Sequence, residues 1–427
     1  MVLFVRTFTR VLICAGLGLG LLLGGSPGLA ATTEQKDPFA DIASVMRSGD
    51  LPRADRMLRK LLDDDRYRQR AVQTLDRLHQ LDSFELEPDE LTIGRALKST
   101  GTVMRRYETP HFVTLSDGDA SWTRTKTALL ERTYHQFYRF TDQFGVEVVP
   151  PERKLLCIIF ADYERYRRFA KTVDGVDAPW AGGYFATRSN RVVLFDDRDS
   201  PAINEAIRTL DEHQSQARET RERAIKAAST DLGSMAEALS LAADRLDAQV
   251  DSNRARILAH AERLATSKTI HEAVHLLSYN SRLQSLGRVY PFWVSEGLAT
   301  SFETDKPNLP FGPTRSYAPR ETGFDRVVAE NRLIPIETVV TLPAGLEGAD
   351  QLGDPIYSQS YQLFTHLAQT SPGAMREYLA ELQHMPSGYF NRDLQKAVFE
   401  KHFGRLNAIE RALTRGRGES RLAQSQR

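Results

Sequence analysis

The chain has little cysteine: Cys14 and Cys157 are its two cysteines among 427 residues. Cys14 falls in an N-terminal segment that we expect to be removed, so the mature chain holds one thiol and can form no internal disulfide. Cys157 stands in the apolar run 155–160, which predicts a buried, unreactive thiol and not a catalytic nucleophile. The exported fold must therefore be held together by its apolar core or by a metal ion.

The chain also lacks an excess of charge of either sign. It carries 56 Lys and Arg against 56 Asp and Glu, so the net charge gives no reason to expect nucleic-acid binding or attraction to anionic membranes. Hydrophobic residues make up 41% of the chain and charged residues 26%, which excludes a polytopic membrane protein and a wholly disordered one. The length predicts two or three domain-sized units.

Residues 1–30 have a composition of their own. Arg6 and Arg10 precede an apolar run over 11–25, and small residues follow as far as Ala30. A basic start, a short apolar middle and a small-residue exit predict a secretory signal peptide, because a membrane span needs about 20 apolar residues. We expect cleavage at or just after Ala30 and a periplasmic protein with no integral membrane span. An uncleaved N-terminal anchor is the alternative.

Beyond this segment the chain predicts an α+β fold with helical regions at both ends. Helical periodicity over 36–100 favours a helical cap or a partner surface. Strand and helix patterns alternate over 105–200, and the strand at 191–195 is a plausible edge to which an extended peptide could add. Residues 371–427 are expected to be helical, with a disordered basic tail.

Residues 201–265 interrupt this alternation and predict an antiparallel helical hairpin. Ser200 is a favourable N-cap and Pro201 a favourable first helical residue. Apolar residues then recur at steps of three or four as far as a break at 229–233, and they recur again beyond it. The hairpin could be a protein-binding arm or a solvated spacer, and the sequence leaves both readings open.

The segment that carries chemistry is the H-E-x-x-H motif at 271–275. Residues four apart share one face of a helix, so His271 and His275 can reach one ion. Zinc accepts neutral imidazole nitrogen, and Glu272 stands beside the first ligand, where it can take a proton from metal-bound water. Taken alone, the motif also fits a helix with two hydrogen-bonded histidines and an exposed glutamate.

A third ligand for zinc is available downstream. Glu296 follows His275 by 21 residues and lies within the apolar stretch 292–302. Burying a carboxylate without a partner is very costly, and a divalent cation would supply that partner. A glutamate favoured by the dipole at a helix N-terminus is the other explanation, but it leaves the two histidines unexplained.

H-E-x-x-H followed some twenty residues later by W-x-x-E-G-x-A, here at 293–299, resembles the gluzincin metallopeptidases. It looks closest to a bacterial, often exported, peptidase-MA-like family. The resemblance covers about 107–370 without the hairpin. It implies a zincin-like catalytic domain, formed by 105–200 and 266–370, with a small mixed sheet and an active-site helix.

Carried over residue by residue, the resemblance implies His271, His275 and Glu296 as zinc ligands. It implies Glu272 as the general base and later the proton donor. In aminopeptidase N-type enzymes, which share W-x-x-E-G-x-A, a tyrosine some sixty residues past the third ligand stabilises the oxyanion. Tyr357 stands 61 residues past Glu296 and is the first choice for this role.

Three features of the sequence depart from these families or stay open. Tyr361, four residues after Tyr357, is the second choice for the oxyanion. The thermolysin-like pattern has an aspartate four residues after the glutamate ligand, where this chain has Thr300, so Glu303 or a backbone carbonyl must orient a histidine instead. No G-x-M-E-N element, which aminopeptidases use to hold a substrate amine, is present, and this favours endopeptidase action.

The sequence therefore predicts a zinc-dependent peptidase that acts on a peptide or protein substrate and binds no nucleic acid. The alternative is a non-catalytic periplasmic interaction protein with a structural or vestigial zinc site, whose hairpin 201–265 binds a partner. A zinc hydrolase for a non-peptide amide would share the same site.

Overall fold

The structure is a computed structural model, and it describes residues 37–47, 51–82, 85–178, 181–230, 232–345, 352–386 and 390–415. The expected signal peptide and the expected disordered tail beyond residue 415 lie outside these ranges. Contacts divide the chain into two compact units, Met1–Ala40 and Asp41–Arg427, and the site lies wholly in the second. No helix in the described ranges is both long and apolar enough to cross a membrane.

A mixed sheet of five strands lies at the centre of the second unit, which confirms the α+β class. The strands are β1 (Arg105–Glu108), β2 (Phe112–Ser116), β3 (Leu155–Phe160), β4 (Gly183–Ala186) and β5 (Arg191–Phe195). Their order is β1-β2-β3-β5-β4, with β2, β3 and β5 parallel and the outer strands β1 and β4 antiparallel to their neighbours.

The expectation that 191–195 forms an edge is wrong. β5 lies between β3 and β4, because the chain turns at 187–190 and pairs β4 with β5 in an antiparallel ladder. The open edge on this side is therefore β4.

Helices cover both faces of the sheet, so β3 is buried throughout. Cys157 faces the larger core with α5 (Ala120–Phe144), and Ile158 faces a smaller one with α6 (Tyr163–Phe169). The Cys157 thiol is free and fully buried, and burial raises its pKa well above the ordinary range. This agrees with the expectation of an unreactive thiol.

The remaining helices before the hairpin are α1 (Pro38–Arg47), α2 (Leu51–Leu61), α3 (Arg68–Asp82) and α4 (Glu90–Ser99), with the short helices η1 (Ala170–Asp174) and η2 (Asp197–Asp199).

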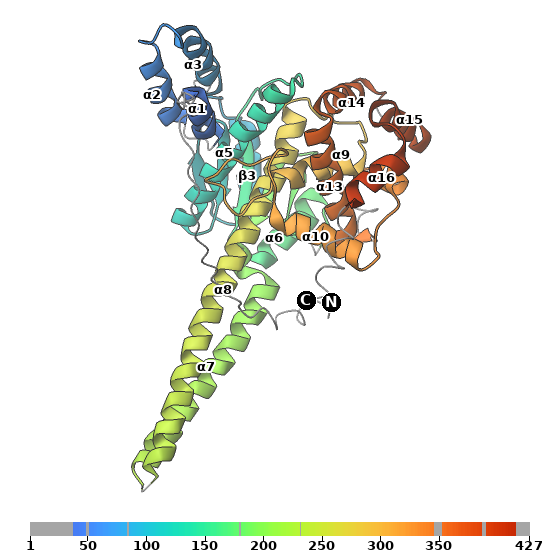
Figure 1. Cartoon of the computed structure of the whole chain (residues 1–427). Helices are drawn as coiled ribbons and strands as arrows, with labels where there is room; N and C mark the ends of the chain where they lie inside the picture. Colours follow the sequence, from blue (N-terminus) through green and yellow to red (C-terminus); the bar gives the residue numbers. More distant parts are fainter. Residues whose placement is uncertain are drawn as a thin grey trace, which may run out of the picture. The chain divides into compact units, whose positions relative to one another are not determined.

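The helical hairpin consists of α7 (Pro201–Ala228) and α8 (Gly233–Asn280), which run side by side in Figure 1. The side chain of Ser200 caps α7 as predicted. The seam is made of small and apolar residues seven apart, which lets the two backbones approach closely: Leu210, Ala217 and Ala224 on α7, and Ala236, Ala243 and Val250 on α8.

α8 continues past residue 265 as far as Asn280, so the second arm of the hairpin runs into the H-E-x-x-H motif. The whole helix has 48 residues and carries the motif in its last third. The second arm of the hairpin and the helix that carries the H-E-x-x-H motif are therefore one continuous helix.

α9 (Phe292–Phe302) follows α8, and its residues are almost all buried, mainly against α13 and α8. The helices after α9 are α10 (Ala318–Ala329), α11 (Ile336–Thr341), α13 (Asp354–Thr370), α14 (Pro372–His384), α15 (Arg392–Phe403) and α16 (Leu406–Thr414).

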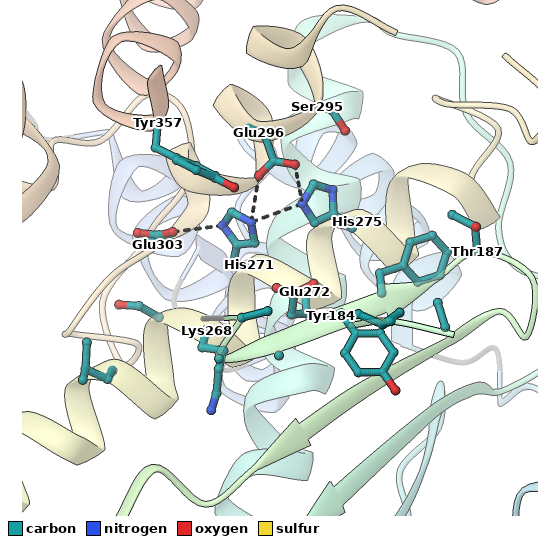
Figure 2. A pocket seen from close by; sticks show the side chains of 18 of the residues that line it. Tyr184, Thr187, Lys268, His271, Glu272, His275, Ser295, Glu296, Glu303 and Tyr357 are labelled. Carbon is teal, nitrogen blue, oxygen red and sulfur yellow. Dashed lines mark hydrogen bonds and ion pairs between the residues drawn. The ribbon is translucent and has the colours of Figure 1, made fainter. Parts of the chain in front are cut away.

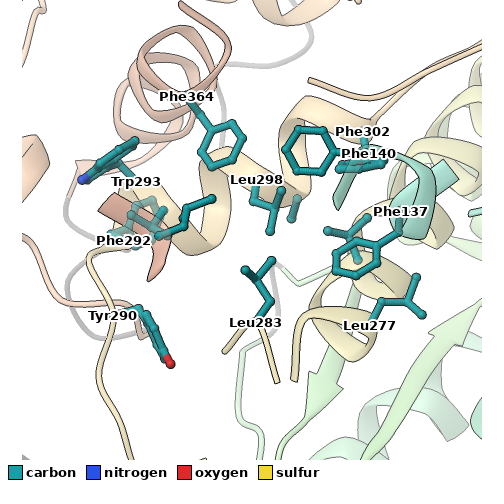
Figure 3. Close-up of a cluster of buried hydrophobic side chains, with 14 of the residues drawn as sticks. Phe137, Phe140, Leu277, Leu283, Tyr290, Phe292, Trp293, Leu298, Phe302 and Phe364 are labelled. Carbon is teal, nitrogen blue, oxygen red and sulfur yellow. The ribbon is translucent and has the colours of Figure 1, made fainter. Parts of the chain in front are cut away.

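Two residues of W-x-x-E-G-x-A hold α9 in place. Trp293 is fully buried and stacks on Tyr378 of α14, with ring centroids 5.5 Å apart. A Cβ at Gly297 would lie 2.7 Å from the carbonyl oxygen of Ser360, so only glycine lets α13 cross α9 this closely. Figure 3 shows this packing around Phe292, Trp293, Leu298, Phe302 and Phe364. α13 and α14, of which α14 lies outside the family resemblance, thus fix the helix that carries Glu296.

Candidate metal centre

His271, His275 and Glu296 come together at one point between α8 and α9 (Figure 2). The Nε2 atoms of the two histidines are 3.2 Å apart. Glu296 approaches His271 Nε2 to 3.2 Å through one carboxylate oxygen and His275 Nε2 to 3.4 Å through the other. The structure therefore brings together the three residues that the sequence suggests as ligands.

The spacing of these atoms fits a zinc ion. Ligand atoms about 2.05 Å from a tetrahedral zinc lie about 3.3 Å from one another. The three contacts at the centre, between 3.2 and 3.4 Å, match this separation. Two imidazole nitrogens and a carboxylate are also a donor set that zinc prefers, and a tetrahedral ion would retain a fourth position.

A second carboxylate orients His271. Glu303 lies 2.9 Å from His271 Nδ1, and Arg320 of α10 donates two hydrogen bonds to Glu303 at 2.6 and 2.7 Å. Burial raises the pKa of Glu303, but Arg320 and His271 lower it by more, so the net shift is downward. The carboxylate is therefore ionised and can only accept hydrogen bonds. The hydrogen must then be on Nδ1, which directs the Nε2 lone pair of neutral His271 to the centre.

The charges of the site favour a cation. Burial lowers the pKa of His271, but hydrogen bonds with Glu296 and Glu303 outweigh it and raise that pKa to about 10. The carboxylates therefore stabilise a positive charge at this place, which a proton or a metal ion can supply.

Glu272 lies next to the centre and is not one of the converging ligands. Its side chain lines the same cavity, and burial is the main cause that raises the pKa of its carboxyl group. Both neighbouring histidines oppose this rise when they are charged. A buried carboxylate that binds protons readily beside a metal position suits a general base.

The centre opens into a large cavity of about 1430 Å³. The edge strand β4 forms one wall and α8 another. Parts of η1, α9, the loop after α9, the start of α10 and the start of α13 also line the cavity.

The two tyrosines on α13 have different surroundings. Tyr357 lines the cavity, packs edge-on against Phe292 at 5.2 Å between ring centroids, and points towards Glu296 in Figure 2. Tyr361 is buried, and its hydroxyl accepts a hydrogen bond from the backbone N–H of Tyr317 at 2.9 Å. The hydroxyl group of Tyr361 is thus used within the fold, and Tyr357 is the tyrosine of α13 that faces the cavity.

Sequence reasoning missed Lys268 and Asp197. Lys268 precedes His271 by one helical turn, and its ammonium group lies 2.6 Å from Asp197 and 4.0 Å from the centre of the Phe195 ring. The helical spacing could have placed Lys268 beside the motif. Nothing in the sequence could have paired it with Asp197, which comes from η2 more than sixty residues earlier.

A second group of potential ligands, His111, Glu131 and His135, lies between β2 and α5. Its geometry differs from that of the first group, because His111 Nδ1 is 2.5 Å from Glu131 Oε1. That separation is a strong hydrogen bond and is shorter than two ligands of one zinc ion allow. His111 also stacks on Tyr134, at 3.7 Å between ring centroids, as part of the core.

Glu303→Gln should weaken zinc binding about 10-fold to 100-fold, because a neutral amide orients His271 less well and no longer balances Arg320. Competition with a chromophoric zinc chelator would measure this. Glu330→Gln, at the end of α10 and exposed to solvent, serves as the matched control and should bind zinc like the wild type. If the wild type and both variants bind zinc with equal affinity, Glu303 does not contribute to the metal centre.

Comparison with known proteins adds one finding. Residues 265–315 match a family described as a protein of unknown function, DUF1570. This segment contains both histidines, Glu272, Glu296 and Glu303. No curated protein and no solved structure matches the chain.

Proposed function

We propose that the protein is a zinc-dependent peptidase, and an endopeptidase in preference to an exopeptidase. The observation that carries the proposal is the zinc-like spacing of His271, His275 and Glu296 beside the buried carboxylate of Glu272. The signal-peptide pattern at the N-terminus supports action in the periplasm, which cell fractionation would test.

Zinc bound by the three ligands would acidify a water molecule and polarise the carbonyl group of a peptide bond. Glu272 takes a proton from that water as its oxygen bonds to the carbonyl carbon. Glu272 then gives the proton to the amide nitrogen as the C–N bond breaks, so one water yields a carboxylate end and an amine end. Tyr357 donates a hydrogen bond to the oxyanion that develops between these steps.

The edge strand supports a peptide as the substrate. β4 is the last strand of the sheet on the cavity side, and Gly183, Tyr184, Phe185 and Ala186 all line the cavity. An extended peptide can pair its backbone with such an edge, which aligns a scissile bond with the metal position. The chain has no G-x-M-E-N element that would hold a free amine, so internal bonds are the expected targets.

Glu272→Gln should retain one zinc ion per chain and lose hydrolysis of a peptide library by about 100-fold or more, because the general base is lost. Metal analysis and mass-spectrometric mapping of the digest would measure both. Glu237→Gln, an exposed residue near the tip of the same helix, is the control and should cleave like the wild type. If Glu272→Gln cleaves as fast as the wild type, the mechanism is wrong.

A wild-type protein that binds zinc stoichiometrically but cleaves no peptide would instead favour the interaction protein with a vestigial site.

Tyr357→Phe should lower kcat by about 100-fold with little change in KM, because one oxyanion donor is removed. Tyr361→Phe should leave kcat nearly unchanged but lower the free energy of unfolding by about 1–3 kcal/mol, since the N–H of Tyr317 loses its acceptor. Steady-state kinetics and thermal unfolding of the two variants would separate these roles. A large loss of kcat in Tyr361→Phe, with little loss in Tyr357→Phe, would instead show that Tyr361 contacts the substrate.

A further inference from the structure

The cavity continues past the metal centre onto the base of the hairpin. The residues of α8 that line it recur at steps of three or four and therefore form one face of the helix: His260, Arg263, Leu264, Ser267, Lys268, His271, Glu272, His275 and Tyr279. At 1.5 Å per residue, this face is about 28 Å long, and more than half of it lies before the H-E-x-x-H motif. The hairpin is thus part of the wall of the cavity.

We infer that the base of the hairpin, residues 260–267, is a substrate subsite that binds an extended polypeptide and selects an acidic side chain opposite Arg263. The inference rests on the proposed peptidase function and adds a specificity to it. Its basis is the position of these residues in the cavity together with the pairing of the charges around them.

Most charged groups at this end of the cavity already have partners. Lys268 pairs with Asp197 at 2.6 Å, and Arg320 pairs with Glu303 at 2.6 Å. Arg263 lines the cavity and makes no ion pair within the described part of the chain. An exposed, unpaired guanidinium in a substrate cavity is suited to bind a carboxylate on the ligand.

Two other residues of the cavity bear on where a carboxylate would bind. His260 lies one turn from Arg263 on the same face of α8 and adds a second hydrogen-bond donor. Asp305, on the loop after α9, also lines the cavity and makes no ion pair among the described residues. A carboxylate on the peptide is therefore expected to face α8 and to avoid this loop.

The helix also sets the distance between the acidic residue and the bond that is cleaved. Arg263 precedes Glu272 by nine residues, which corresponds to about 13 Å along α8. β4 runs beside this helix: Gly183 contacts Lys268, and Phe185 packs on Tyr279. A strand advances about 3.3 Å per residue, so a peptide paired with β4 would present its fourth residue from the scissile bond to Arg263.

The test uses two pairs of twelve-residue fluorogenic peptides with one central cleavage sequence. In one pair the fourth residue on the N-terminal side of the scissile bond is Glu or Lys, and in the other pair it is the fourth residue on the C-terminal side. In one of these pairs, the wild type should cleave the Glu peptide about threefold to fivefold faster in kcat/KM, the effect of an exposed ion pair. Arg263→Glu should reverse that ratio.

Arg256→Glu is the matched control, because it makes the same charge change about 10 Å farther along the same face, beyond the cavity lining. It should keep the wild-type ratio. A wild type that cleaves all peptides without preference, or a preference that survives in Arg263→Glu, would overturn the subsite and leave the peptidase intact. A wild type that cleaves none of them would overturn the proposed function and the subsite together.

Discussion

The burial of two carboxylates beside two imidazoles is the constraint on which the site depends. Glu296 and Glu303 both lie in the interior, where an unpaired negative charge is very costly. Arg320 neutralises Glu303, but the partners of Glu296 at the centre are the imidazoles of His271 and His275. The arrangement is complete only when a positive charge lies among these three side chains, and the separations of their ligand atoms suit a metal ion.

The rest of the second unit serves to hold these groups at fixed distances. Trp293 anchors α9 to the C-terminal helices, and Gly297 lets α13 pack close enough to bring Tyr357 to the cavity. α8 carries both histidines on one face, and the sheet places its edge strand beside them. The site is therefore built from four separate elements, and each of its side chains is oriented by packing or by a hydrogen bond. Such support is what keeps catalytic groups in register.

The sequence allowed the inner part of the site to be predicted because local spacing determines it. Two histidines four apart on a helix share a face whatever the remaining fold, and an apolar helix that contains Glu296 requires a partner for that glutamate. Arg320 and Asp197 could not be found in the same way, because they reach the site through tertiary contacts between distant segments. The edge of the sheet was misassigned for a related reason: the apolar pattern of 191–195 fits an inner or an outer strand, and the pairing of β5 with β3 joins distant segments of the chain.

X-ray absorption at the zinc edge of the purified full chain tests the central claim most directly. The account predicts one zinc ion per chain with nitrogen and oxygen ligands at about 2.0–2.2 Å, no sulfur, and the multiple-scattering pattern of two imidazoles. One imidazole should disappear from that pattern in His275→Ala. A zinc ion with an unchanged spectrum in this variant, or a protein that takes up no zinc, would contradict the account.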